Sequence, residues 1–277
     1  MRFAKALRYP ALLALGAAAV FGAVMVFRTP SLERDWKVEY AVLPQVAIEG
    51  DAVSLRNVRN FAYGPDGAID EARYYDADYD LAALTGVWYG LSHFTDYGLA
   101  HSFLSFGFAD GRFLAVSIEG RQERGEDYHP VWGLFRNFEL VYVLADERDV
   151  IGLRTHVRKQ RVLLYELVLS GEDARALLVS LLQTADEAAR RPSFYNTLTD
   201  NCTTNIVKYA EDISPWQHLL DYRVLLPGYS DRLAYELGLI ATDRPLEALQ
   251  ERAYLDPARA APDDPDFSIK IRGLSPP

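Results

Sequence analysis

The central part of the chain alternates between apolar and polar positions, and this pattern predicts β-strands. Residues 99–109 (LAHSFLSFGFA) and 112–121 (RFLAVSIEGR) lie on either side of Asp110-Gly111. Two β-rich runs around Asp-Gly are typical of a hairpin. Further strands are predicted at 138–145 and 161–170, and 150–157 is a candidate for one more. We therefore expect a mostly antiparallel sheet.

The two faces of the second hairpin strand are expected to differ, because successive side chains point to opposite faces of a strand. One face carries the apolar side chains of Leu114, Val116 and Ile118, which we interpret as core. The other face carries Phe113, Ala115, Ser117 and Glu119.

Helical patterns follow the strands. Ser170, with Asp173 three positions on, is a candidate N-cap for a helix that runs to about Arg190. The polar loop 193–201 (SFYNTLTDN) leads into a helix over 202–211, and another helix near 230–238 ends at Gly238. The remaining segments read as a linker with some strand character (29–50), loop with short strands (51–80) and irregular chain (256–277). A sheet packed on helices belongs to the α+β class.

Residues 9–27 (YPALLALGAAAVFGAVMVF) form an uncharged run of 19, close to the roughly 20 apolar residues that span a bilayer. Basic residues precede this run, and acidic residues dilute the basic ones after it. The positive-inside rule then predicts a cytoplasmic N-terminus and an external remainder. A cleaved signal peptide is the alternative, although the run exceeds a typical h-region of about 7–15 residues. The expected organisation is a cytoplasmic terminus (1–8), a transmembrane helix (9–27), a linker (28–50) and an extracytoplasmic domain (51–277).

The charge balance disfavours nucleic-acid partners. The net charge is −10, and the chain after residue 28 holds 25 basic and 39 acidic residues with no run of Lys and Arg. Without such a run the phosphate backbone of DNA or RNA has no complementary surface.

The sequence carries no clear signature for a metal or a cofactor. DADYD (76–80) resembles the start of a calcium loop, but Leu81 stands at the sixth position and Val87 at the twelfth, where Gly and Glu are required. We interpret it as a solvated turn. No H-x-x-x-H, H-E-x-x-H, P-loop, G-x-G-x-x-G or G-x-S-x-G is present. We therefore expect neither a metal nor a cofactor.

Cys202 is the only cysteine, and it stands where a polar loop turns into a helix. The unpaired N–H groups and partial positive charge of a helix N-terminus favour a thiolate. The neighbouring residues 200–205 are polar, which is not typical of a core position. A small buried hydrophobe is the alternative reading, and the polar surroundings favour a nucleophile.

A nucleophilic thiol needs a base and an orienting group. Of the five histidines (His93, His101, His129, His156 and His218), only His101 starts a strongly predicted strand. Across the hairpin, Glu119 or Ser117 is expected to lie near that imidazole, and Glu119 is a candidate to hold its Nδ1–H, as the third group does in a Ser-His-Asp triad. The backbone N–H of Cys202 is a candidate oxyanion donor, with the Asn201 amide as a weaker one. A strand histidine with a local hydrogen bond and a surface carboxylate are the alternatives for His101 and Glu119.

Several blocks of sequence resemble one bacterial family. AHSFLSFGFADGRFLAVSIEGR, LADERDVIGLRT, FYNTLTDNCTTNIV and LPGYSDRLAYELGLI are similar to the Lnb N-terminal periplasmic domain, over roughly residues 50–275. The resemblance implies a circularly permuted papain-like fold of the NlpC/P60 type, in which a histidine strand precedes the nucleophile helix. It further implies Cys202 as nucleophile, His101 as base and a third member on the strand of Ser117 and Glu119.

The family takes its name from lipoprotein intramolecular transacylases, which carry further transmembrane helices after this domain. This chain shows no such run after residue 28, so lipoprotein transacylation does not follow from the resemblance. We expect a single-pass protein of the bacterial inner membrane whose periplasmic domain is a thiol hydrolase or acyltransferase. Its expected partners are an envelope lipoprotein, a lipid or a peptidoglycan peptide. The alternative is a non-catalytic binding or scaffold module, in which Cys202 is buried, unreactive and distant from His101.

Overall fold

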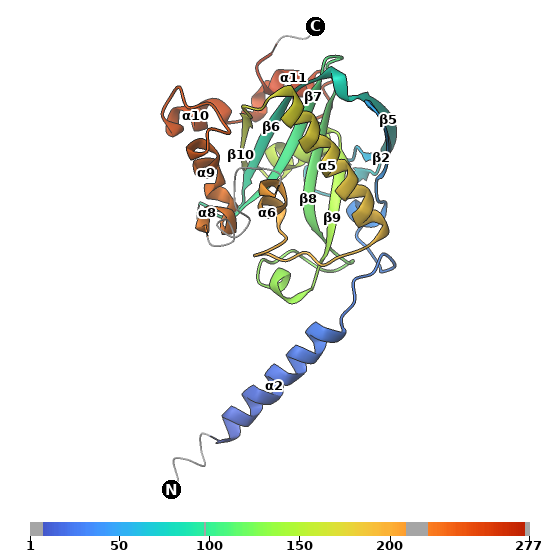
Figure 1. The fold of residues 1–277 in the computed structure, drawn as a ribbon, viewed down its shortest axis with the longest axis vertical. Coiled ribbons are helices and arrows are strands. Elements are labelled where there is room, and N and C mark those ends of the chain that lie inside the picture. Colours follow the sequence, from blue (N-terminus) through green and yellow to red (C-terminus); the bar gives the residue numbers. More distant parts are fainter. Residues whose placement is uncertain (1–7, 97, 209–220, 275–277) are drawn as a thin grey trace.

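A computed structural model describes residues 8–96, 98–208 and 221–274 of the chain. It has a mixed α/β architecture built on one large sheet (Figure 1). The strands are β1 (Gln45–Glu49), β2 (Ala52–Arg59), β3 (Ala62–Tyr63), β4 (Ile69–Glu71), β5 (Tyr74–Asp80), β6 (Leu84–His93), β7 (Ala100–Phe108), β8 (Phe113–Arg121), β9 (Glu139–Ala145) and β10 (Arg161–Glu166). The α-helices are α2 (Arg8–Phe27), α3 (Val38–Ala41), α4 (Glu147–Gly152), α5 (Gly171–Arg190), α6 (Cys202–Val207), α8 (Tyr222–Leu225), α9 (Ser230–Glu236), α10 (Leu246–Ala253) and α11 (Phe267–Ile271). Short turns of 3₁₀ or π-helix lie at η1 (Leu81–Ala83), η2 (Trp132–Phe135), η3 (Leu153–Val157), η4 (Pro227–Tyr229) and η5 (Pro257–Arg259).

The sheet follows the order β1-β2-β9-β8-β7-β6-β10, and β5 pairs with β2 outside this path. The pairs are antiparallel except β2 and β9, which meet in parallel at Arg59 and Ala145. The predicted β7–β8 hairpin is confirmed, with Phe103 opposite Ser117. Gly111 has a φ of 82° at its turn, a left-handed conformation that glycine adopts without strain. The two strands that carry the predicted site residues therefore lie side by side in the interior of the sheet.

Apolar side chains cover both faces of the sheet. One core contains Leu104 and Val116 from the strands and Leu178 from α5, which crosses this face (Figure 1). The other core contains Phe103 and Ala115, together with residues of α4 and α11. Leu114, Val116 and Ile118 are core residues as predicted. The opposite face of β8 is also covered, which the sequence pattern did not predict.

The prediction of a strand at 150–157 was wrong. This segment forms the end of α4 and the π-helix η3. The Asp146 side chain accepts a hydrogen bond of 2.9 Å from the backbone N–H of Arg148, so the chain is capped into a helix as soon as β9 ends. Apolar content alone could not distinguish these two outcomes.

Other segments are also more regular than predicted. The linker contains β1, the loop at 51–80 contains β2 and β5, and 256–277 contains α11. DADYD belongs to strand β5 and not to a turn, with its aspartates exposed on alternate positions. The strand β6 was missed because Gly86 and Gly90 interrupt its pattern. A Cβ at Gly90 would lie 2.2 Å from Cζ of Phe103, so this glycine admits the Phe103 ring from the neighbouring strand.

The helix predictions were mostly confirmed. Ser170 caps α5 by accepting a hydrogen bond from the Asp173 N–H, and Gly238 follows α9 with a φ of 69°. The helix predicted over 202–211 begins at Cys202 and is described to Val207. Lys208 is the C-cap residue of this helix, and residues 209–211, as well as His218, lie outside the described part of the chain.

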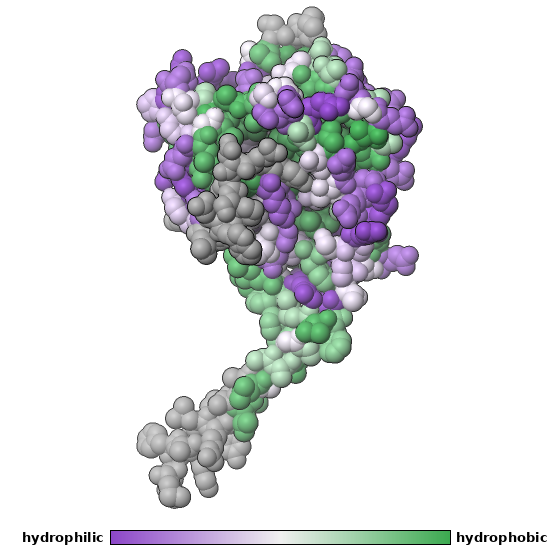
Figure 2. Space-filling model, in the orientation of Figure 1, coloured by the Kyte–Doolittle hydropathy of each residue, from purple (hydrophilic) through white to green (hydrophobic). Residues whose placement is uncertain are grey.

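Helix α2 extends away from the sheet (Figure 1) and carries exposed apolar side chains such as Leu13 and Val26 (Figure 2). Its contact with the rest of the molecule includes the rings of Phe21 and Phe135, whose centroids are 4.9 Å apart. Within the described residues, no helix has the length and apolar character needed to cross a membrane. The predicted transmembrane helix is therefore not found.

A buried charge cluster fixes α11 to the sheet. The Arg272 guanidinium donates to both oxygens of Glu147, at 2.8 and 2.6 Å. It also lies over the rings of Trp88 and Phe113, 4.4 and 3.9 Å from their centroids. Ser105 donates a further hydrogen bond to Glu147. This cluster, which we call the Arg272 clamp, fully neutralises a carboxylate that has no solvent exposure.

Candidate functional site

A cavity of about 670 Å³ opens where β7 begins, and the predicted nucleophile and base both line it. Its walls come from α3, β7, β8, the loop before η2, η3 and the loop that precedes α6. The lining residues that carry charge or a hydroxyl include Glu39, Tyr40, Glu119, Tyr128, Arg154, Arg158 and Tyr195. The cavity therefore joins segments that are far apart in the sequence.

Cys202 is the first residue of α6, where the capping of the helix fixes its position. The Thr204 N–H donates to Oδ1 of Asn201 at 2.8 Å, and the Asn201 N–H donates to the Thr204 hydroxyl at 2.8 Å. This reciprocal arrangement is a capping box. It leaves the Cys202 N–H at the helix start, where no intrahelical partner exists.

The thiol is less exposed than the polar neighbours suggested. Cys202 is 4% exposed and packs in the core on the α5 side of the sheet. Its Sγ accepts a hydrogen bond of 3.5 Å from the backbone N–H of Ser102, the residue directly after His101. The expectation of a non-core position was therefore wrong, although the residue does border the cavity.

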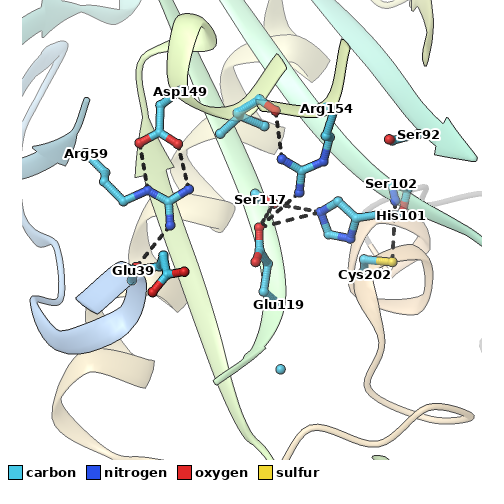
Figure 3. Close-up of polar contacts among 12 residues, drawn as sticks. Glu39, Arg59, Ser92, His101, Ser102, Ser117, Glu119, Asp149, Arg154 and Cys202 are labelled. Atoms are coloured by element: carbon cyan, nitrogen blue, oxygen red, sulfur yellow. Dashed lines mark hydrogen bonds and ion pairs between the residues drawn. The ribbon is translucent and has the colours of Figure 1, made fainter. Parts of the chain in front are cut away.

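His101 is buried at the start of β7, 8% exposed, and its ring stacks on that of Phe103. Its Nε2 is 2.7 Å from the Ser117 hydroxyl, and that hydroxyl donates to Oε1 of Glu119 at 2.6 Å. Nε2 is 3.8 Å from the same carboxylate oxygen. Ser117 therefore stands between His101 and Glu119 (Figure 3). The chain of contacts involves Nε2, and the prediction that Nδ1 makes this contact was wrong.

These contacts determine which imidazole nitrogen carries the proton. A carboxylate only accepts hydrogen bonds, and a serine hydroxyl has a single hydrogen to donate. Since Ser117 donates to Glu119, its oxygen is left to accept from an Nε2–H of His101. In the neutral imidazole, Nδ1 is then the unprotonated nitrogen that can accept a proton.

Glu119 is an ionised carboxylate despite its burial. It accepts from the Tyr40 hydroxyl at 2.8 Å and from the Arg154 guanidinium at 3.2 Å, in addition to Ser117. Burial alone would raise its pKa, but the charge of Arg154 and these hydrogen bonds hold the pKa of Glu119 well below its usual range. The carboxylate is therefore available to stabilise positive charge on His101.

His101 is neutral at physiological pH. Burial lowers its pKa to about 3, and the charges of Arg154 and Arg158 act in the same direction, while Glu119 opposes them. The imidazole is thus unprotonated and can accept a proton, although this low pKa makes it a weak base.

Cys202 and His101 approach the cavity from different sides of the sheet. Strand alternation places His101 on the face of Phe103, whereas Cys202 belongs to α6 on the opposite face. They meet at the start of β7, where the Ser102 N–H contacts the sulfur (Figure 3). Although both residues are described, no hydrogen bond joins Sγ to the His101 ring.

Asn201 has a structural part in this arrangement. Its Oδ1 caps α6, and its Nδ2 donates to the Thr197 carbonyl at 2.7 Å. The side chain borders the cavity, but its amide already fixes the loop to the helix start.

The other described histidines lie in different environments. His129 lines the cavity, and its Nδ1 accepts from the Val131 N–H within its own loop. His93 contacts the backbone carbonyls of Arg161 and Gly228, and His156 contacts Thr155 and Pro257. Among the described histidines, His101 alone has the serine and glutamate partners.

Sequence reasoning missed Tyr40, Arg154 and Arg158. Tyr40 comes from the segment read as a linker. Arg154 lies in the segment read as a strand (150–157), and Arg158 directly follows that segment. The spacing of Arg154 and Arg158 would have placed them on one side of a helix, but only after that segment was recognised as helical.

The fold and the cavity define a mixed α/β domain with a thiol beside a histidine–serine–glutamate chain. The model of the Lnb N-terminal periplasmic domain family matches residues 70–228, more than half of the chain. This protein therefore belongs to the Lnb N-terminal periplasmic domain family and is a periplasmic, envelope-associated protein. The match is shorter than the resemblance at 50–275 suggested and includes all the candidate catalytic residues. No curated protein and no solved structure matches the chain.

Proposed function

We propose that this protein is a periplasmic thiol hydrolase or acyltransferase with Cys202 as its nucleophile and His101 as its base. The observation that carries the proposal is the chain from His101 through Ser117 to Glu119, which ends in the same cavity as the Cys202 sulfur. Such an arrangement holds an imidazole in one tautomer and stabilises its charged form. A circularly permuted papain-like relationship is part of this proposal, supported by the order of the histidine strand and the cysteine helix.

The proposed reaction begins when the thiol proton moves to Nδ1 of His101. The thiolate sulfur attacks a carbonyl carbon, a C–S bond forms, and the carbonyl electron pair moves to oxygen. The backbone N–H of Cys202 is suited to stabilise that oxyanion. The intermediate collapses to a thioester and expels the leaving group, which takes the proton from His101.

The second half-reaction releases the acyl group. Water, or a hydroxyl or amine of an acceptor, gives its proton to His101 and attacks the thioester carbonyl. The C–S bond breaks, and the Cys202 thiol recovers the proton. Glu119 supports the positive charge on His101 in both halves through Ser117.

The proposed substrates are acyl or amide groups of the cell envelope, carried by a lipoprotein, a lipid or a peptidoglycan peptide. The periplasmic family assignment supports this choice. The exposed apolar side chains of α2 support association with the inner membrane.

Alkylation of Cys202 in the full chain tests the proposed pair. Iodoacetamide should modify the native thiol at pH 7, and His101→Gln should slow the reaction by about 100-fold, the lower range for loss of a general base. His129→Gln is the matched control, because His129 lines the same cavity without contacting Ser117. Equal rates in the wild type and His101→Gln would rule out the proposed pair.

A non-catalytic binding or scaffold module is the second candidate. The burial of Cys202 favours it, together with the absence of a hydrogen bond between the described Cys202 and His101 side chains. In that case the thiol reacts only on unfolding, and its rate follows the denaturant concentration.

A further inference from the structure

A π-helix turn brings two arginines to the wall of the cavity. Arg154 lies within η3, and Arg158 caps its C-terminal end. The next residue, Lys159, has a φ of 51°, so the chain leaves the helix sharply and returns Gln160 to the same cavity. π-helical turns occur frequently at functional sites, and here the turn concentrates positive charge beside His101.

Arg154 has only part of its hydrogen-bonding capacity satisfied. It is 3% exposed and donates to Glu119 and to the Val150 carbonyl. Its Nε is buried without a partner in the part of the chain that the structure describes. A buried donor without an acceptor is costly, so the contacts of Arg154 with Glu119 and Val150 hold this side chain at an unfavourable position behind the cavity wall.

Arg158 carries a charge that has no counter-ion among the residues that the structure describes. Its side chain is exposed, and among the described residues no carboxylate forms an ion pair with it. Glu39 also lines the cavity, yet it does not pair with Arg158. Within the described residues Glu39 likewise forms no ion pair, whereas the remaining charged residues that line the cavity are paired, Lys37 with Asp127 and Arg154 with Glu119.

The two guanidinium groups repel each other and act on the base. The charge of Arg158 contributes to lowering the pKa of Arg154, after the larger effect of burial, and it also contributes to lowering the pKa of His101. A bound anion would relieve both effects, because it would neutralise Arg158 and make His101 a stronger base.

We propose that Arg158, with Arg154 behind it, forms an oxyanion-binding subsite of the Cys202 cavity, so that the substrate carries a carboxylate or phosphate near the carbonyl that is attacked. The role of this subsite in substrate recognition rests on the proposed thiol chemistry. The observations that support anion binding are the charges of the cavity wall. It defines the substrate class as anionic acyl or amide compounds. Arg158 is a specificity residue in this scheme, because it contacts the substrate away from the reacting atoms.

Two alkylating reagents that differ in charge test the subsite directly in the full chain. Iodoacetate carries a carboxylate, whereas iodoacetamide of nearly the same shape is neutral. With both, the Cys202 sulfur forms a bond to carbon, iodide leaves, and the thiol proton is transferred to His101. We expect Arg158→Gln to lower the ratio of the iodoacetate rate to the iodoacetamide rate by about fivefold at low ionic strength.

Lys159→Gln is the matched control, because it removes the same charge from an exposed neighbour that does not line the cavity. Its ratio should stay near that of the wild type. Acetate and inorganic phosphate, added separately, should slow iodoacetate in the wild type and not in Arg158→Gln, and the stronger competitor identifies the preferred anion. Equal ratios in the wild type and Arg158→Gln, or an equal loss in Lys159→Gln, would overturn the subsite.

Thermal unfolding separates failure of the subsite from failure of the thiol chemistry. If Cys202 reacts with neither reagent, the proposed function fails. Anion binding can still be measured in that case, from the shift in Tm. Inorganic phosphate or acetate should raise the Tm of the wild type and Lys159→Gln but not that of Arg158→Gln, since a ligand stabilises only the state that binds it. No shift with either anion, in a protein whose thiol is silent, would overturn the subsite as well.

Discussion

At the scale of single residues, the central feature is a serine between a histidine and a glutamate. In a triad of the usual form the carboxylate contacts the imidazole directly, whereas here the Ser117 hydroxyl relays the contact at 2.7 and 2.6 Å. Ser117 determines the tautomer of His101, and so it is a positioning residue. The relay has two hydrogen bonds that can each be removed by substitution.

Removing the Ser117 hydroxyl should slow alkylation of the Cys202 thiol without unfolding the protein. In Ser117→Ala, His101 loses the acceptor for Nε2–H, and we expect alkylation of Cys202 by iodoacetamide to slow about tenfold, less than the loss expected without the base. Ser105→Ala is a matched control, because it removes a similar serine–glutamate contact, at Glu147, away from the cavity. An unchanged rate in Ser117→Ala would show that the relay does not orient the base.

The burial of His101 also predicts how stability depends on pH. Its pKa is about 3 in the folded protein and about 6.5 when unfolded, so the unfolded state binds an extra proton between these values. Above pH 6.5 the imidazole is neutral in both states, so His101 does not lower the free energy of unfolding. As pH falls from 6.5 toward 3, the unfolded state binds the proton and the free energy of unfolding decreases. When the pH is lowered from 7 to 5, the free energy of unfolding measured in urea should fall by on the order of 2 kcal/mol more in the wild type than in His101→Gln. The same loss in both proteins would contradict a neutral buried His101.

The sequence predicted the residue types of this site better than their contacts. Cys202, His101, Ser117 and Glu119 were found because a helix start and a hairpin are local patterns. Tyr40 and Arg154 were missed because they reach Glu119 from positions 79 and 35 residues away. Long-range packing of this kind leaves no local pattern in the sequence.

At the scale of elements, the cavity wall depends on a close approach of two backbones. The Gly228 N–H donates to the Gly98 carbonyl at 2.8 Å, and this contact holds η4 against the loop before β7. Gly98 has a φ of 78°, and a Cβ there would lie 2.4 Å from the Tyr229 ring. Leu99, Leu225 and Pro227, which line the cavity, flank this contact.

A pair of glycine substitutions separates the clash from backbone strain. Gly98→Ala and Gly125→Ala both place alanine at positive φ, but a Cβ at Gly125 meets nothing within 4 Å. Gly125→Ala should cost roughly 1 kcal/mol of unfolding free energy from strain alone. Gly98→Ala should cost clearly more in urea unfolding and should also change the rate of Cys202 alkylation. Equal costs would show that the Gly98–Tyr229 contact relaxes freely.

Element prediction succeeded where a turn or cap was encoded locally. Asp110-Gly111 marked the hairpin, and Ser170 marked the start of α5. The prediction failed at β6, whose glycines serve the neighbouring strand, and at 150–157, where a cap on Asp146 outweighed apolar content. In both cases tertiary packing or a short-range hydrogen bond overrode the propensity of the segment.

At the scale of the whole molecule, the Arg272 clamp connects α11 to the centre of the sheet. Glu147 has no solvent exposure, and Arg272 is its counter-ion. Arg272→Gln leaves this carboxylate without a paired charge, and we expect a loss of about 3–5 kcal/mol in urea unfolding. Lys270→Gln, which alters a partly exposed ion pair on the same helix, should change the unfolding free energy by much less. A small effect of Arg272→Gln would mean that the stability of the fold does not depend on this buried ion pair.

The clamp also orders the events of biosynthesis. Arg272 follows Glu147 by 125 residues, so strands β6 to β9 and α4 leave the ribosome well before their counter-charge does. Until Arg272 emerges, closing the sheet over Glu147 would bury a carboxylate that has no paired positive charge. A nascent chain of this protein should therefore reach its protease-resistant state only after α11 and Arg272 have left the ribosome.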